Sequence, residues 1–343
     1  MMFINSFLFS QDKRQNQYLT ESEAKEALAS DHLRPILIAL YEFRYSNQGE
    51  CNIHVLIEAG RLEPEAVWQA INLLEEADWV RMWNVEGKYT VTGIGAVNLE
   101  HFSIAPRDIA LRSQAARDWL IKKLVDNYSS SHREDSVARS MLYNNDDMID
   151  RDVDLAIGDC CDLGLIRLSA NDIRLLQSGF RYHKERELWR EISDHFKQLH
   201  TCSTPQKRGI EFQRLFSRLI GMDKWTVEES AKSSNEEIDI LVHREREDYL
   251  VECKWEQKPT EASQIREFQG KLYNRSGARG IFASMSGFSQ GAVRQVEEQL
   301  SQRELLIFGP NDLRMLFARE KSFEDMLTEK HRVMVRRKEG LWE

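Results

Sequence analysis

The sequence predicts a multidomain α+β protein, in which a mostly helical N-terminal half precedes an α/β domain with a central mixed sheet. Two observations lead to this fold class. Apolar residues recur at helical spacing through most of residues 1–200, whereas residues 205–320 alternate helical patterns with short strand-like apolar runs. At 343 residues, the chain is long enough for two or three domains with separate cores.

The N-terminal half opens with the pattern of three helices and a hairpin. The helices are expected at residues 33–45, 53–57 and 65–77, and the strands at residues 79–85 and 88–91. Pro35 and Pro64 fit the first turns of the first and third helices, where a backbone N–H has no helical partner. Glu86 and Gly87 supply the turn of the hairpin. This order resembles a winged helix-turn-helix unit, which we place at residues 1–105.

A weaker copy of this order follows at residues 106–181. Helices are expected at residues 110–128, 135–142 and 150–163, and short strands at residues 164–168 and 172–176. The sequence therefore predicts two winged-helix-like units in tandem. Three residues of these units, Trp68, Trp79 and Cys160, are expected to pack in the core.

The third helix of the first unit leaves the role of the N-terminal half open. Gln69 and Asn72 are suited to reading base edges. Acidic residues on and beside the same helix repel phosphates, and they are Glu63, Glu65, Glu75 and Glu76. Arg81 and Lys88 of the hairpin favour a nucleic-acid backbone. Recognition of nucleic acid, dimerisation and contact with an activating partner or ligand therefore stand as alternatives.

The net charge is distributed unevenly along the chain. It is −9 at pH 7, and residues 201–343 balance 24 Lys and Arg against 24 Asp and Glu. Residues 1–200 therefore carry the whole excess, with 23 basic and 32 acidic residues. Because nucleic-acid affinity depends on neutralising phosphates, this half is a poor general DNA clamp.

The remaining segments connect and end the two halves. A linker helix is expected at residues 182–204, because Leu188, Ile192, Phe196 and Leu199 fall at helical spacing. The α/β domain follows at residues 205–320, and a locally basic C-terminal tail at residues 321–343.

The composition is that of an ordinary soluble protein, with 41% hydrophobic and 30% charged residues. No run approaches the roughly 18 apolar residues of a membrane span. The five cysteines form no C-x-x-C pair, which argues against structural zinc. We expect a cytoplasmic protein without membrane contact.

Two neighbouring strands of the α/β domain carry charged residues among aliphatic ones. Asp239 lies on the first strand, and Glu252 and Lys254 lie on the second. Because strand side chains alternate, Glu252 and Lys254 share one face while Cys253 points to the other. His243 is expected in the turn between the strands. Further acids nearby leave the acidic set without a unique assignment, and they are Glu236, Glu237 and Glu256.

Two carboxylates converging from a hairpin suit Mg²⁺, which prefers oxygen ligands and retains several waters. Mn²⁺ is expected as a substitute. A lysine beside the metal can orient a water or help to deprotonate it, and it can neutralise charge that builds on a phosphorane-like transition state. Hydrolysis of a phosphodiester needs this combination. The plainer interpretation is a hairpin whose acids are solvated and whose lysine balances their charge.

The surrounding elements favour the first interpretation. A helix at residues 207–221 precedes the two strands, and alternating helices and strands are expected at residues 262–273, 280–284, 289–300, 305–308 and 311–318. This region resembles the Mrr-like restriction endonuclease family within the PD-(D/E)xK nuclease superfamily. The matching residues are Gly209, Phe212, Ile238, Asp239, Glu252, Cys253, Lys254, Trp255, Gln269, residues 280–284 and residues 287–289.

The resemblance implies that Asp239 and Glu252 bind the metal, that Lys254 is catalytic and that Gln269 supports the site. Glu211 lies where some members place an additional acid. The resemblance also implies nucleic acid as the substrate, in particular double-stranded DNA, and a role in restriction or anti-phage defence. Cutting both strands of a duplex would favour a homodimer.

The sequence thus predicts a Mg²⁺-dependent endodeoxyribonuclease with an N-terminal recognition or regulatory module. The alternative is a non-catalytic regulator that binds DNA or protein and uses the nuclease fold as a scaffold. RNA as the substrate, the sequence specificity, the activating signal and the oligomeric state stay open at this point.

Overall fold

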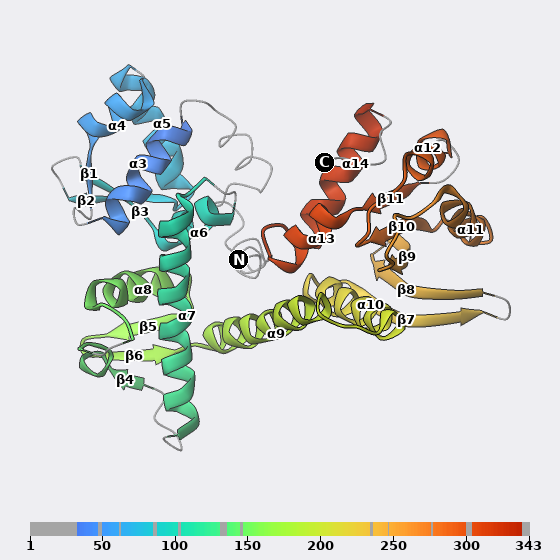
Figure 1. Ribbon diagram of the computed structural model, residues 1–343. Coiled ribbons are helices and arrows are strands. Elements are labelled where there is room, and N and C mark those ends of the chain that lie inside the picture. The colour runs from blue at the N-terminus through green and yellow to red at the C-terminus, as the bar shows by residue number, and fades with distance from the viewer. Residues whose placement is uncertain are drawn as a thin grey trace. The chain divides into compact units, whose positions relative to one another are not determined.

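The chain forms two compact units, residues 1–186 and residues 187–343 (Figure 1). The computed structural model describes residues 33–46, 50–61, 63–84, 88–101, 104–130, 136–144, 147–233, 236–245, 247–275, 277–299 and 304–337. The first 32 residues of the predicted 1–105 domain and the turn predicted at Glu86 and Gly87 lie outside these ranges. Within these ranges, no helix is long and apolar enough to cross a membrane.

The first unit begins with elements close to the predicted ones. They are α3 (Leu33–Tyr45), β1 (Cys51–Asn52), α4 (Ile53–Gly60), α5 (Pro64–Glu76), β2 (Val80–Asn84) and β3 (Lys88–Val91). Strand β3 lies between β1 and β2 and is antiparallel to both. Helix α4 begins where the Asn52 side chain accepts a hydrogen bond from the His54 backbone (3.0 Å). Helix α5 begins at Pro64. The three helices predicted here are confirmed.

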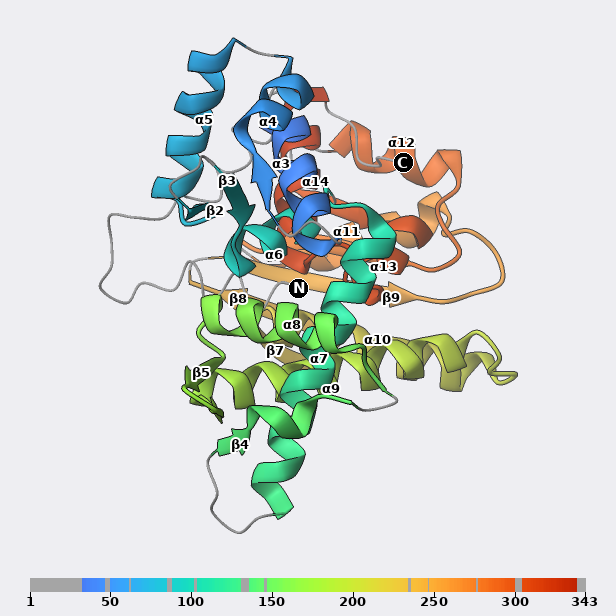
Figure 2. The same ribbon diagram turned by 90° about the vertical axis from the view of Figure 1, so that its left-hand side faces the viewer.

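A second run of elements completes this unit. It consists of α6 (Gly93–His101), α7 (Arg107–Ser130), β4 (Ser136–Ala138), the 3₁₀ helix η1 (Arg139–Leu142), α8 (Asp150–Asp162), β5 (Ile166–Ser169) and β6 (Asp172–Leu175). Strand β6 lies between β4 and β5. Helix α7 packs against α8, and Figures 1 and 2 show both helices.

The helix predicted at residues 135–142 is wrong. Residues 136–138 instead pair antiparallel with β6, and the following four residues form the 3₁₀ helix. The pairing buries Val137, which is 7% exposed. A long-range contact therefore outweighs the local helical pattern of this short segment.

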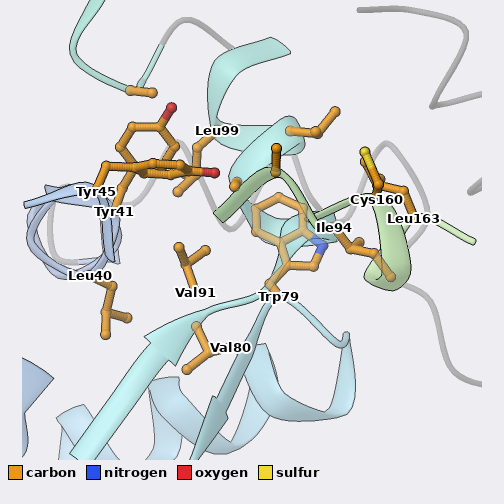
Figure 3. Close-up of a cluster of buried hydrophobic side chains, with 14 of the residues drawn as sticks. Leu40, Tyr41, Tyr45, Trp79, Val80, Val91, Ile94, Leu99, Cys160 and Leu163 are labelled. Carbon is orange, nitrogen blue, oxygen red and sulfur yellow. The ribbon is translucent and has the colours of Figure 1, made fainter. Parts of the chain in front are cut away.

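One apolar core joins both runs of elements in the first unit (Figure 3). The first hairpin contributes Trp79 and Val91, and helix α8 contributes Cys160. Trp79 and Cys160 are buried, so their prediction as core residues is confirmed. Trp68 differs, because it keeps 40% of its surface exposed and meets the Tyr89 ring edge-on. Helix α5 therefore presents an aromatic ring to solvent.

Buried charges cross-link the helices around this core. Asp159 of α8 accepts hydrogen bonds from Arg44 of α3 (2.5 Å) and Arg117 of α7 (3.0 Å). Arg117 also pairs with Glu100 of α6, which accepts a hydrogen bond from the Tyr41 hydroxyl (2.7 Å). The four charged side chains are at most 9% exposed. Because each charge has an opposite partner, removing one member leaves a costly buried charge.

The second unit is built on a five-stranded mixed sheet, which confirms the prediction of a mixed sheet. In the order β11-β10-β9-β8-β7, it contains β7 (Thr226–Ser233), β8 (Glu236–Arg244), β9 (Glu247–Lys254), β10 (Arg279–Ser284) and β11 (Leu305–Phe308). Strands β9, β10 and β11 are parallel, and β8 and β7 extend the sheet antiparallel. The prediction omitted β7, because this edge strand is mostly polar and lacks an apolar strand pattern.

Helices cover both faces of this sheet. They are α10 (Pro205–Met222), α11 (Ala262–Tyr273), α12 (Gln290–Gln299), α13 (Pro310–Phe317) and α14 (Phe323–Arg337). Helix α9 (Gln177–Leu199) begins in the first unit and packs against α13, where the rings of Phe196 and Phe317 stack. Helices α11 and α12 share a core cluster with Leu250 and Phe282. Helices α10 and α14 pack on the opposite face, where the rings of Phe216, Phe308 and Phe323 lie within 6.4 Å of one another.

The stretch predicted as a C-terminal tail contains helix α14 instead. Its residues Phe323, Met326 and Leu327 are buried and fall at helical spacing. Lys330 forms an ion pair with Asp312 of α13 at 2.7 Å. The packed domain therefore continues beyond residue 320.

Replacing Asp159 by asparagine should destabilise the first unit by about 3–5 kcal/mol, because Arg44 and Arg117 would lose a buried anionic partner. Urea unfolding followed by tryptophan fluorescence measures this loss. Asp154→Asn is the matched control, since its partner Arg139 is 40% exposed and such pairs contribute about 0–1 kcal/mol. Equal small losses in the two variants would contradict the structural role of Asp159.

The same carboxylate should make the stability of this unit depend on pH. Burial alone would raise the pKa of Asp159, but Arg44 and Arg117 hold it below its usual value. A carboxyl group of this kind stabilises the fold above its unfolded pKa of about 3.9, and this contribution is lost as the pH falls through the folded value. Below about pH 4, the free energy of unfolding should fall more steeply for wild type than for Asp159→Asn. Parallel curves would count against this account.

Candidate active site

Two neighbouring strands place three residues on one face of the second unit's sheet. Asp239 belongs to β8, and Glu252 and Lys254 belong to β9. The strands are antiparallel neighbours, so side-chain alternation directs these three residues to the same face. It is the face covered by α11, because Leu250 packs into the core cluster of that helix. The structure thus brings the two carboxylates and the lysine together.

Asp239 is held at the point where the pairing of β8 with β9 ends. The last paired residues at this end are Ile240 and Val251. Beyond them, the backbone N–H of Cys253 donates to Oδ2 of Asp239 (2.8 Å). The Gln213 side chain of α10 donates to the backbone oxygen of Asp239 (2.6 Å). The carboxylate therefore takes the place of a strand carbonyl and stays beside β9.

Glu252 lies between two lysines. Its Oε1 is 3.2 Å from Nζ of Lys254, and its Oε2 is 2.9 Å from Nζ of Lys271, which belongs to α11. Glu252 is 7% exposed, whereas the side chains of Lys254 and Lys271 are 31% and 16% exposed. Each oxygen of this buried carboxylate therefore has a positively charged partner, which offsets the cost of its burial.

Burial and neighbouring charges shift the pKa values of both Asp239 and Lys254. Burial raises the pKa of Asp239, and the neighbouring carboxylate of Glu252 raises it further. Burial would lower the pKa of Lys254, but Glu252 and Asp239 outweigh this effect and raise it above its usual value. Lys254 is therefore a charged ammonium at neutral pH, suited to stabilising negative charge rather than to accepting a proton.

Asp239 and Glu252 fit a divalent cation. The two carboxylates repel each other in a partly buried place, and a cation between them would relieve this repulsion. Among the described residues, no cluster of three or more His, Cys, Asp or Glu side chains could hold a metal. Waters or substrate oxygens would have to complete the shell, as Mg²⁺ prefers. The side chains of Glu236 and Glu237 lie outside the described residues.

Two predicted site residues have their contacts elsewhere. Gln269 of α11 is 3% exposed, and its side-chain oxygen accepts a hydrogen bond from Gln295 of α12 (3.1 Å). Glu211 of α10 pairs with Arg214 of the same helix at 2.7 Å and lies 3.9 Å from His195. In the part of the chain that the structure describes, neither residue forms a hydrogen bond or ion pair with the two site carboxylates or Lys254.

Lys271 is the site residue that the sequence reasoning missed. It follows Gln269 by two residues, which is about 200° around a helix axis. Gln269 consequently meets α12 while Lys271 meets β9. Lys271 lies beside the apolar stripe of Phe268 and Leu272, and this position was its only sequence signal.

Two smaller predictions concern neighbours of the site. Cys253 is buried, as expected for a core residue, and burial raises the pKa of its thiol. The prediction of His243 as a turn residue is wrong. Strand β8 continues to Arg244, and the His243 ring lies 2.5 Å from the Asp248 carboxylate on β9. The strand is longer than expected because its pairing with β9 continues past the apolar run.

Residues 206–309 match the family model Mrr_cat, which is described as a restriction endonuclease. The matched segment runs from α10 to β11 and contains Asp239, Glu252 and Lys254. A search of curated proteins finds no match.

Two solved structures were found to be similar to the chain. The protein of unknown function AF1548 is 15% identical, with a TM-score of 0.26 over 36% of this chain and 66% of its own length, slightly under two thirds. The protein VC1899 from Vibrio cholerae is 11% identical, with a TM-score of 0.23 over 85% of this chain and 80% of its own. Likenesses this weak carry no argument about fold or function. The family match identifies the C-terminal part of this chain, at residues 206–309, as a restriction endonuclease domain of the Mrr_cat family.

Proposed function

We propose that this protein is a Mg²⁺-dependent endonuclease that hydrolyses phosphodiester bonds of DNA. The observation that carries the proposal is the convergence of Asp239, Glu252 and Lys254 on one sheet face, inside the segment that matches a restriction endonuclease family. Two carboxylates on one sheet face, one of them 3.2 Å from a lysine ammonium, match the needs of phosphodiester hydrolysis.

Each residue has a distinct task in this proposal. Asp239 and Glu252 hold the cation, with Mn²⁺ as a substitute for Mg²⁺. The bound cation supplies Lewis-acid activation of a water and neutralises charge on the phosphate. Lys254, the more exposed of the two lysines at Glu252, stabilises the negative charge that develops on the phosphate oxygens. The hydrogen bond from Cys253 to Asp239 keeps that carboxylate in place throughout.

The N-terminal half serves in this proposal as a regulatory or recognition module made of two winged-helix-like units. Their support is the repeated order of elements, α3-β1-α4-α5-β2-β3 and α7-β4-η1-α8-β5-β6. The two small sheets also share one strand order, with the last strand in the middle, as β1-β3-β2 and β4-β6-β5.

The solvent face of α5 favours contact with a protein over contact with DNA. Trp68 is 40% exposed and Leu73 is 57% exposed on this face. Glu65 and Glu76 are exposed beside them, and carboxylates repel a phosphate backbone. An activating partner or a second copy of the chain fits such a surface better. A role in restriction of foreign DNA accords with the description of the matching family.

Replacing Lys254 by alanine should lower the cleavage rate at least about 100-fold, because one stabilising charge is lost from the transition state. The full chain is incubated with supercoiled plasmid, single-stranded DNA and RNA, each with Mg²⁺, Mn²⁺ or EDTA, and the products are separated on a gel. We expect cleavage of plasmid in both metals and none in EDTA.

The matched control is Lys258→Ala, which removes an exposed lysine four residues further along. It should cleave like wild type. Full activity in Lys254→Ala would refute the catalytic assignment, and cleavage in EDTA would refute metal dependence. Degradation of RNA alone would correct the substrate class.

A further inference from the structure

Lys271 reaches the site from a helix that takes no other part in it. Its Nζ lies 2.9 Å from Oε2 of Glu252, closer than Lys254 lies to Oε1. The backbone of α11 is fixed at this point, because Phe268 and Leu272 on either side are 1% and 0% exposed. The lysine is thus delivered to Glu252 by the packing of the helix against the sheet.

The charges of the four site residues balance. Asp239 and Glu252 contribute two negative charges, and Lys254 and Lys271 contribute two positive ones. The cluster is therefore neutral before any cation binds, and a divalent cation has to enter against two ammonium groups.

The two lysines differ in access to solvent. The Lys254 side chain is 31% exposed, whereas the Lys271 side chain is 16% exposed. The more exposed ammonium is the one that a phosphate can approach. Both ammonium groups contact Glu252, so it is the difference in exposure that gives Lys254 the substrate side of the site and Lys271 the protein side.

We propose that Lys271 is a built-in counter-ion of Glu252, which holds this carboxylate in position before metal binds and sets the affinity of the site for a divalent cation. This inference rests on the proposed nuclease function. Lys271 is then a positioning residue. Through it, the packing of α11 determines the metal concentration that the enzyme needs.

The test compares the full-length wild type with Lys271→Met, Lys271→Arg, Glu252→Gln and Arg266→Met. Titration calorimetry with MnCl₂ measures metal affinity without substrate, and melting curves with EDTA or MnCl₂ measure stability. Arg266→Met is the matched control. It removes a positive charge from the same helix, but its partner is Gln295 of α12 (3.2 Å), away from Glu252.

Lys271→Met should bind Mn²⁺ at least about tenfold more tightly than wild type. This is the effect of losing one positive charge roughly 6 Å from a divalent cation under full water screening. Its melting temperature in EDTA should fall, and its rise on adding Mn²⁺ should exceed that of wild type, because the metal replaces the missing counter-ion. Lys271→Arg and Arg266→Met should bind Mn²⁺ like wild type.

Unchanged or weaker affinity in Lys271→Met would overturn the role of Lys271, as would an equal gain in Arg266→Met. In both cases the nuclease proposal stands if Glu252→Gln loses metal binding. A wild type that binds no Mn²⁺, or a Glu252→Gln variant that binds it normally, would instead overturn the proposed function and this inference with it. If Lys271→Met does not fold, Lys271→Gln replaces it, since glutamine keeps a hydrogen-bond donor without the charge.

Discussion

The site depends on keeping two like charges together where water is scarce. Asp239 and Glu252 share one sheet face, and Glu252 is 7% exposed. Their repulsion is opposed by three contacts from different places in the fold. The Cys253 backbone binds Asp239, Lys254 reaches Glu252 from the same strand, and Lys271 reaches it from α11. The end of the β8–β9 pairing and the packing of α11 are therefore both conditions for the site.

Each unit contains a cluster of two carboxylates and two cationic side chains, but the two clusters have different roles. In the first unit, two carboxylates and two guanidinium groups are at most 9% exposed and every charge is closed off from solvent. In the second unit, Glu252 is paired with two lysines, one of which is 31% exposed, and Asp239 accepts a hydrogen bond from the Cys253 backbone. A closed cluster fixes helices to one another, while a cluster with one open side leaves room for the cation and the phosphate of the proposed reaction. The two clusters contain similar charged groups, and they differ mainly in how far their side chains are exposed to solvent.

Local patterns predicted most of the elements. Helices at residues 33–45 and 262–273 follow from apolar periodicity, and the strand at residues 305–308 follows from a continuous apolar run. Two of the failures share one cause, since β4 and β7 carry weak strand patterns and exist because a neighbouring strand pairs with them. Helix α14 was predicted as a tail, because its basic residues concealed a buried stripe that only the face of the sheet completes.

The sequence by itself determined that Glu252 and Lys254 share a face, because alternation along a strand is a property of the backbone, whereas Asp239 joined them through the register of β8 against β9. It also indicated the mixed sheet, through the order of helices and strands. The tertiary structure alone decided which helix residue meets these strands. Gln269 and Lys271 both lie on α11, but the rotation of the helix about its axis turns Gln269 toward α12 and Lys271 toward Glu252. That rotation is set by the packing of Phe268 and Leu272 against the sheet, a long-range contact that no local pattern contains.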